Sequence, residues 1–284
     1  MYAELFAIIS AISFSISAIF IKLALNKHHS QFSAIIIFTI SAAVVWLIAL
    51  FANLGLPSAQ ASLLFAIRGV FDPGIAALLL FTAFRKLGVS ITVPIIGAAP
   101  LISTSLSVLF LKEKLTLAIL SGTIFIISGV FVLAFKHPHT KINKKYILMA
   151  VAGSALIGVS AVIAKTALNN SNALFGGLAV TFSAAILIQV VIITALKKWQ
   201  TLPRSFDKAK LFLITSIFSV GGISFIFLAL SKGPVSVVMP LASIQPLISL
   251  FLAFLFLKKH ENITKHIVLG SVMIVAGAVI LTLL

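Results

Sequence analysis

The sequence has no cysteine and few acidic residues. The lack of cysteine excludes disulfides, thiolate catalysis and thiolate metal ligands. Asp and Glu together number 5 against 21 Lys and Arg, and charged residues make up 9% of the chain, where soluble domains carry about a quarter. With 61% hydrophobic residues, the chain cannot cover itself with polar surface. We therefore expect it to lie in a lipid bilayer.

Several functional signatures are also missing. The sequence contains no phosphate-binding loop, nucleotide fingerprint or polar catalytic cluster, and no sizeable soluble segment that could drive an ATP-powered pump. Its histidines lie in or beside polar gaps, at spacings that do not suggest a metal site: His28, His29, His137, His139, His260 and His266. The net charge of +16 also sits in such gaps, which indicates membrane topology and anionic-lipid contacts more than nucleic-acid binding. No cofactor, metal, nucleic-acid partner or enzymatic activity is expected.

Long apolar runs dominate the chain. A helix needs about 20 apolar residues to cross the hydrocarbon, and in a bilayer a helix satisfies its backbone without strand partners. The sequence therefore predicts an all-α integral membrane protein with ten transmembrane helices. The expected ranges are 5–25, 32–54, 61–84, 91–111, 115–135, 146–167, 174–196, 209–230, 235–257 and 266–284.

The two halves of the chain resemble each other. Residues 83–112 recur as 229–258 with 14 of 30 positions identical, and 17–26 recur as 160–169. Such a period indicates a duplication, with repeats at 1–135 and 146–284 joined by 136–145. Because each repeat has five helices, matching helices must cross in opposite directions, which is the inverted-topology repeat of many secondary transporters. A duplicated scaffold without transport function is the alternative.

The charge distribution predicts the orientation. In and beside the gaps after the odd-numbered helices lie 16 Lys and Arg residues, against four on the other side. The positive-inside rule then places both termini outside the cytoplasm.

The repeated run P-x5-PLIS-x6-FLK, which starts at Pro94, and the lysine near the end of the first helix of each half resemble the drug/metabolite transporter superfamily, and within it the EamA family. The resemblance implies a proton- or exchange-driven carrier of small metabolites in the plasma (inner) membrane, with a cavity lined by helices 1–4 and 6–9. It also implies cytoplasmic termini, which conflicts with the charge count. The tryptophan common early in the family's first helix is missing, and Phe14 lies in that neighbourhood.

Asp72 is the acidic residue that falls in the middle of an expected helix. A charge near the bilayer centre costs at least about 2.5 kcal/mol, so it marks a candidate functional site. Arg68 lies one turn earlier on the same face, and Pro73 with Gly74 predicts a kink. We expect Arg68 and Asp72 to bind substrate or a coupling proton; mutual neutralisation inside the bundle is the alternative.

Two expected helices carry prolines at matching points, which is typical of helices broken around a midplane site. These gating candidates are Pro94, Pro100, Pro240 and Pro246. Nearby polar residues are candidates for binding: Gln245, Ser103 and Ser249, together with Gln189 in helix 7. The serines have an alternative role, because serine in a membrane helix often bonds its own backbone.

Glycines seven residues apart mark one face of helix 5 and of helix 10: Gly122 and Gly129, and Gly270 and Gly277. Small residues allow close helix packing, here within the chain or, as the alternative, in a homodimer. Lys22 and Lys165 are expected to extend toward the membrane surface, with an ion-path role as the alternative. The sequence as a whole predicts a secondary carrier of small solutes; a passive channel is the alternative, and the substrate stays open.

Overall fold

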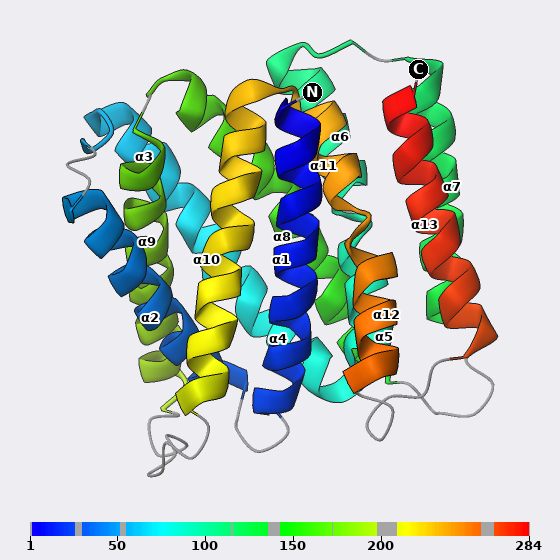
Figure 1. Cartoon of the computed structure of the whole chain (residues 1–284), viewed down its shortest axis with the longest axis horizontal. Helices are drawn as coiled ribbons and strands as arrows, with labels where there is room; N and C mark the ends of the chain where they lie inside the picture. The colour runs from blue at the N-terminus through cyan, green and yellow to red at the C-terminus, as the bar shows by residue number, and fades with distance from the viewer. Residues whose placement is uncertain are drawn as a thin grey trace.

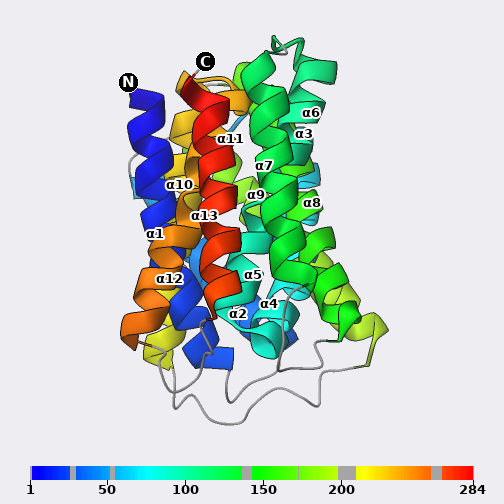
Figure 2. The same cartoon turned by 90° about the vertical axis from the view of Figure 1, so that its right-hand side faces the viewer.

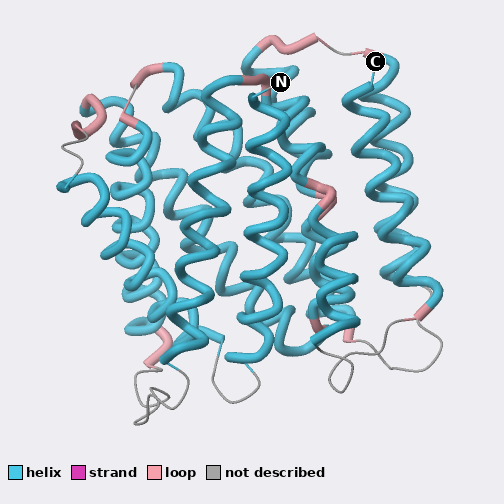
Figure 3. Tube along the Cα trace, in the orientation of Figure 1, coloured by secondary structure: helices cyan, strands magenta, loops and turns pink. Residues whose placement is uncertain are grey.

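The computed structural model describes residues 2–25, 30–51, 55–114, 116–135, 143–171, 173–197, 209–256 and 264–283. Every regular element in these segments is a helix, as Figures 1 and 3 show. In order they are α1 (Tyr2–Leu25), α2 (Ser30–Phe51), α3 (Ala59–Gly69), the π-helical turn η1 (Val70–Ile75), α4 (Ala76–Leu87), α5 (Val89–Ile96), α6 (Ala99–Leu111), α7 (Leu117–Phe135), α8 (Lys144–Asn169), α9 (Leu174–Ala195), α10 (Ala209–Lys232), α11 (Val235–Ala242), α12 (Gln245–Phe256) and α13 (Lys265–Leu283). The predicted all-α membrane class is confirmed.

Eight helical stretches of the described residues are long and apolar enough to cross a membrane. Two shorter apolar stretches, Leu117–Gly129 and Lys265–Gly277, lie in α7 and α13. The count of ten spanning helices therefore stays a prediction. Residues 136–142 of the connecting segment and all the histidines except His266 lie outside the described residues.

Three of the expected helices are interrupted. The range 61–84 is divided into α3, η1 and α4, whereas 91–111 becomes α5 and α6, and 235–257 becomes α11 and α12. Figure 3 shows the break between α11 and α12 about halfway along the bundle, where the tube turns from helix to loop. Matching prolines had predicted breaks in the last two ranges, and Pro73 a kink in the first.

Helix contacts come in related pairs. α1 packs on α10, α11 and α12, while α8, its counterpart in the second half, packs on α3, η1, α4, α5 and α6. A Cβ at Gly233, just after α10, would lie 2.9 Å from the Cβ of Ala3, and Lys165 of α8 donates to the Gly233 carbonyl. The start of α1 and the end of α8 thus lie at the same end of the bundle, so these matching helices run in opposite directions.

α7 and α13 form a pair at one edge of the molecule, and Figure 2 shows them facing the viewer. A Cβ on Gly129 would lie 2.7 Å from the carbonyl oxygen of Gly270, and one on Gly277 would lie 2.5 Å from that of Gly122. The two backbones approach so closely that only glycine fits at these points. This glycine face is therefore occupied by a contact within the chain.

Candidate functional site

A central cavity of about 170 Å³ lies between the two halves of the chain. One water needs ~10–15 Å³ of such space, so the cavity has room for on the order of ten waters or a small organic solute. Its wall is mostly apolar and includes the rings of Phe14, Phe38, Phe81, Phe84 and Phe227. The polar side chains in the wall are Arg68, Asp72, Ser17, Ser160, Ser219, Ser243 and Gln245.

The break between α3 and α4 places Asp72 at the cavity. Asp72 has extended backbone angles (φ −143°, ψ 120°) because the ring of Pro73 disfavours helical angles in the residue before it. Gln189 of α9 supports the break, since its Nε2 donates to the carbonyls of Pro73 (3.3 Å) and Gly74 (3.2 Å). Gly74 is buried, and a Cβ there would lie 2.6 Å from Ile188 of α9. The break is thus held in place by α9.

Arg68 and Asp72 form the ion pair that their spacing predicts. Arg68 Nη2 donates to Asp72 Oδ2 at 3.0 Å. The Ser160 hydroxyl lies 3.5 Å from the same oxygen and 2.8 Å from the carbonyl of Ile157 in its own helix, and its one hydrogen can bond either acceptor. The guanidinium lies over the ring of Phe227 of α10, 4.9 Å from its centroid. Arg68 is 4% exposed and the Asp72 side chain 18% exposed. Arg68 Nε and Nη1 are buried and have no acceptor among the described residues.

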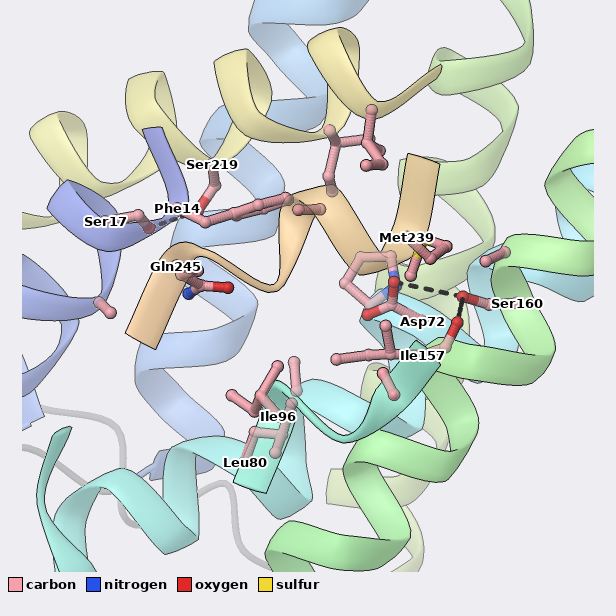
Figure 4. Close-up of a pocket in the computed structure, with 18 of the residues that line it drawn as sticks. Phe14, Ser17, Asp72, Leu80, Ile96, Ile157, Ser160, Ser219, Met239 and Gln245 are labelled. Atoms are coloured by element: carbon pink, nitrogen blue, oxygen red, sulfur yellow. Dashed lines mark hydrogen bonds between the residues drawn. The ribbon is translucent and has the colours of Figure 1, made fainter. Parts of the chain in front are cut away.

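A second polar cluster belongs to helices α1, α10 and α12. The hydroxyls of Ser17 and Ser219 are 2.8 Å apart, and Gln245 opens α12 beside them. In Figure 4 these three residues lie on one side of the cavity with Phe14, while Asp72, Ser160 and Met239 lie on the other. The polar wall is thus divided into two clusters, separated by apolar surface.

Sequence reasoning missed the cavity serines. Ser17 and Ser160 occupy the first positions of the matching stretches 17–26 and 160–169, so the repeat itself was a usable signal. Ser17 meets Ser219, whereas Ser160 meets Asp72. Equivalent positions in the two halves therefore face the cavity, and one of them faces the buried ion pair.

Three of the predicted binding residues do not line the cavity. Gln189 contacts the break in the third helix instead. Ser103 bonds the carbonyl of Pro100 in its own helix at 3.3 Å, the alternative that serine chemistry suggested. Ser249 is 1% exposed, and its hydroxyl has no partner among the described residues. Gln245, Arg68 and Asp72 do line the cavity, and their role in binding stays a prediction.

The prolines bracket the breaks in the fourth and ninth expected helices. The α5–α6 break lies between Pro94 and Pro100, and the α11–α12 break lies between Pro240 and Pro246. Pro100 is tolerated in the first turn of α6 because the amides there have no intrahelical partner. Of the four prolines, Pro100 lines the cavity.

Lys22 and Lys165 each bind the end of a helix from the same half of the chain. Lys22 is 8% exposed, and its Nζ donates to the carbonyl of Phe84 near the end of α4 at 3.1 Å. Lys165 Nζ donates to the carbonyls of Leu230 (2.7 Å) and Gly233 (3.0 Å) at the end of α10. The last carbonyls of a helix lack intrahelical partners and attract a positive charge. Lys22 is buried and does not extend toward the membrane surface, whereas for the half-buried Lys165 that expectation stays a prediction.

Glu113 binds a helix start in the other half. Its carboxylate oxygens accept from the backbone amides of Val235 and Ser236, both at 2.9 Å, and from the hydroxyl of Ser107 at 3.0 Å. A carboxylate at this place satisfies two free amides of α11 and favours the helix dipole. Sequence reasoning placed Glu113 in a gap and did not identify this role, because its partners lie 122 and 123 residues away.

Known proteins resemble this chain in sequence and in fold. An uncharacterized protein of Methanocaldococcus jannaschii is 30% identical over 138 residues, which cover 48% of this chain and 96% of that protein, so the relative has about the length of one repeat. A protein of known crystal structure superimposes with a TM-score of 0.67 at 18% identity, covering 97% of this chain and 98% of its own, which shows a shared fold. The profile of the EamA-like transporter family matches residues 1–135 and again 144–283. The chain therefore belongs to the EamA-like transporter family, as its repeated proline motif had indicated.

Proposed function

We propose that this chain is a secondary active transporter that moves small organic solutes, amino-acid-like or drug-like, by alternating access. The two five-helix repeats, 1–135 and 146–284, are inverted relative to each other and together give ten spanning helices. The opposite directions of α1 and α8 support this arrangement. So do the contacts of each of these helices with the third and fourth helices of the other half.

The observation that carries the proposal is the central cavity with the Arg68–Asp72 pair in its wall. A buried charged pair inside a membrane protein is costly, and residues of this kind commonly mark substrate or ion pathways. Here the pair lies beside a helix break and faces serines and an amide from both repeats. Such a site is suited to a solute with both a charged and an apolar part.

Asp72 is the titratable carboxylate of this site and the candidate for proton coupling. Its carboxylate accepts a hydrogen bond from Arg68 and lies beside the Ser160 hydroxyl, so a proton or a substrate that changes this pairing changes the contacts between α3, α8 and α10. The interrupted helices α5–α6 and α11–α12 are the gating elements of the proposed cycle. Exchange of one solute for another across the membrane is the other coupling mode consistent with the site.

The distribution of basic residues supports an orientation in a plasma (inner) membrane with both termini outside the cytoplasm. The resemblance to the family implies the opposite orientation, with both termini in the cytoplasm. A homodimer would need a surface other than the glycine face, which the α7–α13 contact occupies.

Counterflow in liposomes tests the proposed function. Purified protein is reconstituted, the vesicles are loaded with unlabelled solutes from an amino-acid, amine and nucleoside panel, and uptake of the labelled solute is followed. A carrier gives saturable uptake that is accelerated by solute on the opposite side. Uptake that rises linearly with concentration and shows no counterflow would instead identify the passive channel.

A further inference from the structure

We infer that the cavity recognises a solute carrying a carboxylate on a compact apolar body, and that Arg68 is the residue that binds the carboxylate. This inference rests on the proposed function, because it assigns a substrate class to the same cavity. It concerns which charge the solute must carry, which the transporter family alone does not decide.

The first argument is the hydrogen-bond inventory of Arg68. A guanidinium has five N–H donors in a planar fork, and polar groups buried in protein nearly always find partners. Of the Arg68 nitrogens, Nη2 bonds Asp72, whereas Nε and Nη1 have no acceptor among the described residues. A guanidinium presents two forks of parallel N–H groups, Nε with Nη2 and Nη1 with Nη2. The bond to Asp72 uses one hydrogen of Nη2. One fork is therefore left to accept the two oxygens of a carboxylate in parallel.

The second argument is the charge balance. Asp72 and Arg68 are the charged residues in the cavity wall, over the part of the chain that the structure describes. Asp72 accepts from Arg68 through Oδ2, and the Ser160 hydroxyl lies 3.5 Å from the same oxygen, whereas Arg68 has most of its donors unused. The deficit in the site is thus of acceptors, which a solute carboxylate supplies and a solute ammonium group does not.

The third argument is the rest of the wall. The rings of Phe14, Phe38, Phe81 and Phe84 suit an uncharged hydrocarbon body, and they offer it no hydrogen bond. The polar cluster of Ser17, Ser219 and Gln245 lies across the cavity from Asp72 (Figure 4). A compact solute can therefore place its carboxylate at Arg68 and its hydrocarbon part among the rings.

Binding of this kind also suggests how substrate and conformation are linked. Nε and Nη1 are covered in this conformation, in which the guanidinium lies over Phe227. A carboxylate in the cavity must draw the guanidinium off that ring to reach the free fork of donors. Since Arg68 belongs to α3 and Phe227 to α10, this movement would loosen a contact between the two repeats.

The test uses three compounds with one hydrocarbon body: leucine, isocaproate (leucine without its amine) and isoamylamine (leucine without its carboxylate). Each is titrated against the purified full-length protein, and the thermal unfolding midpoint is followed. Isoamylamine lacks the carboxylate and cannot form charged hydrogen bonds with Arg68. It should therefore need a concentration about tenfold higher than leucine to raise the unfolding midpoint by the same amount. Leucine and isocaproate should both stabilise the protein in a saturable manner.

The variant that tests Arg68 is the double substitution Arg68→Gln with Asp72→Asn, which keeps the shapes and removes both charges together. It should abolish the preference for the two carboxylates. Lys232→Gln is the matched control, because it removes one positive charge at an exposed position in the last turn of α10, outside the cavity wall. This control should retain the preference.

Isoamylamine binding as tightly as leucine, or a failure of both carboxylates to bind, would overturn the inference. A carboxylate preference that survives in the double variant would overturn the role of Arg68. Counterflow separates these failures from failure of the proposed function. If isoamylamine alone is exchanged, the protein is a carrier and the inferred substrate class is wrong. If the carboxylates bind but no solute is exchanged, the inferred recognition site stands and the proposed carrier function is wrong.

Discussion

The third helix of each repeat shows how the two halves differ. In the first half it is divided into α3, η1 and α4 and carries Arg68 and Asp72. In the second half α10 runs unbroken from Ala209 to Lys232, and the matching positions are Ile214 and Phe218. The pair is therefore not needed to build the repeated scaffold, since one copy of the scaffold lacks it. The charges are a feature of the first half, where they line the cavity.

The ends of the same helices show the opposite behaviour. Lys22 binds the end of α4, and Lys165 binds the end of α10, although the two lysines lie in different repeats. Both halves carry the lysine, whereas the ion pair is present in the first half alone. These shared lysines thus bind helix ends, whereas the unshared ion pair lies in the central wall.

The largest effect is expected from removing one charge of the unshared pair. Arg68→Ala leaves Asp72 buried without its partner and should cost about 3–5 kcal/mol of stability, visible as a lower unfolding midpoint and yield. The double variant Arg68→Leu with Asp72→Leu should recover the stability but not transport. Full activity in the double variant would make the pair structural.

The two lysines offer a symmetrical comparison. Lys22→Met and Lys165→Met each remove a charge that bonds helix carbonyls, buried at Lys22 and half-buried at Lys165, so each should lower the unfolding free energy by about 1–3 kcal/mol. Chemical denaturation or thermal unfolding in detergent measures both. If only one substitution destabilises the protein, the helix ends are not equivalent and the comparison between the repeats fails there.

A smaller effect on stability, with a large one on function, is expected for Asp72→Asn. The amide keeps the shape and a hydrogen bond to Arg68 but cannot titrate, so the unfolding midpoint should stay near that of the natural chain. Proton-driven uptake into liposomes should be lost, and transport should become independent of pH. Unchanged transport with unchanged pH dependence would remove Asp72 from the coupling mechanism.

The prolines beside the two breaks should affect rate more than binding. Pro100→Ala and Pro246→Ala allow a continuous helix across the break and should bias the carrier toward one facing state. Turnover in the counterflow assay should then change more than the half-saturating concentration. Equal changes in turnover in the two variants would support equivalent gating elements. Unchanged turnover in both would indicate that the prolines serve packing alone.

The smallest perturbation tests the topology. The natural chain has no cysteine, so Asn143→Cys before α8 and Asn170→Cys after it can be labelled separately with an impermeant thiol reagent. One spanning helix separates them, so intact cells should label one position alone. The charge distribution predicts labelling at Asn170→Cys, and the opposite result would support cytoplasmic termini. Labelling of both would contradict the spanning of α8.

The predictions from sequence succeeded where the signal was local. The Arg68–Asp72 pair lies within one helical turn, and the proline positions mark breaks in their own helices. They failed where a partner lies on another helix. Gln189 was expected in the binding site, yet it donates to the carbonyl of Pro73 on a different helix and supports the break there.

The sequence by itself determined that the chain lies in a bilayer, is helical and is duplicated, because composition, run length and period are properties of the chain alone. Only the tertiary structure decided which polar residues meet. These helices are apolar on all sides, so periodicity does not reveal which face of each is buried. The rotation of each helix about its axis places Ser160 at Asp72 and joins Glu113 to the start of α11. Packing between distant segments sets that rotation, and no local pattern encodes it.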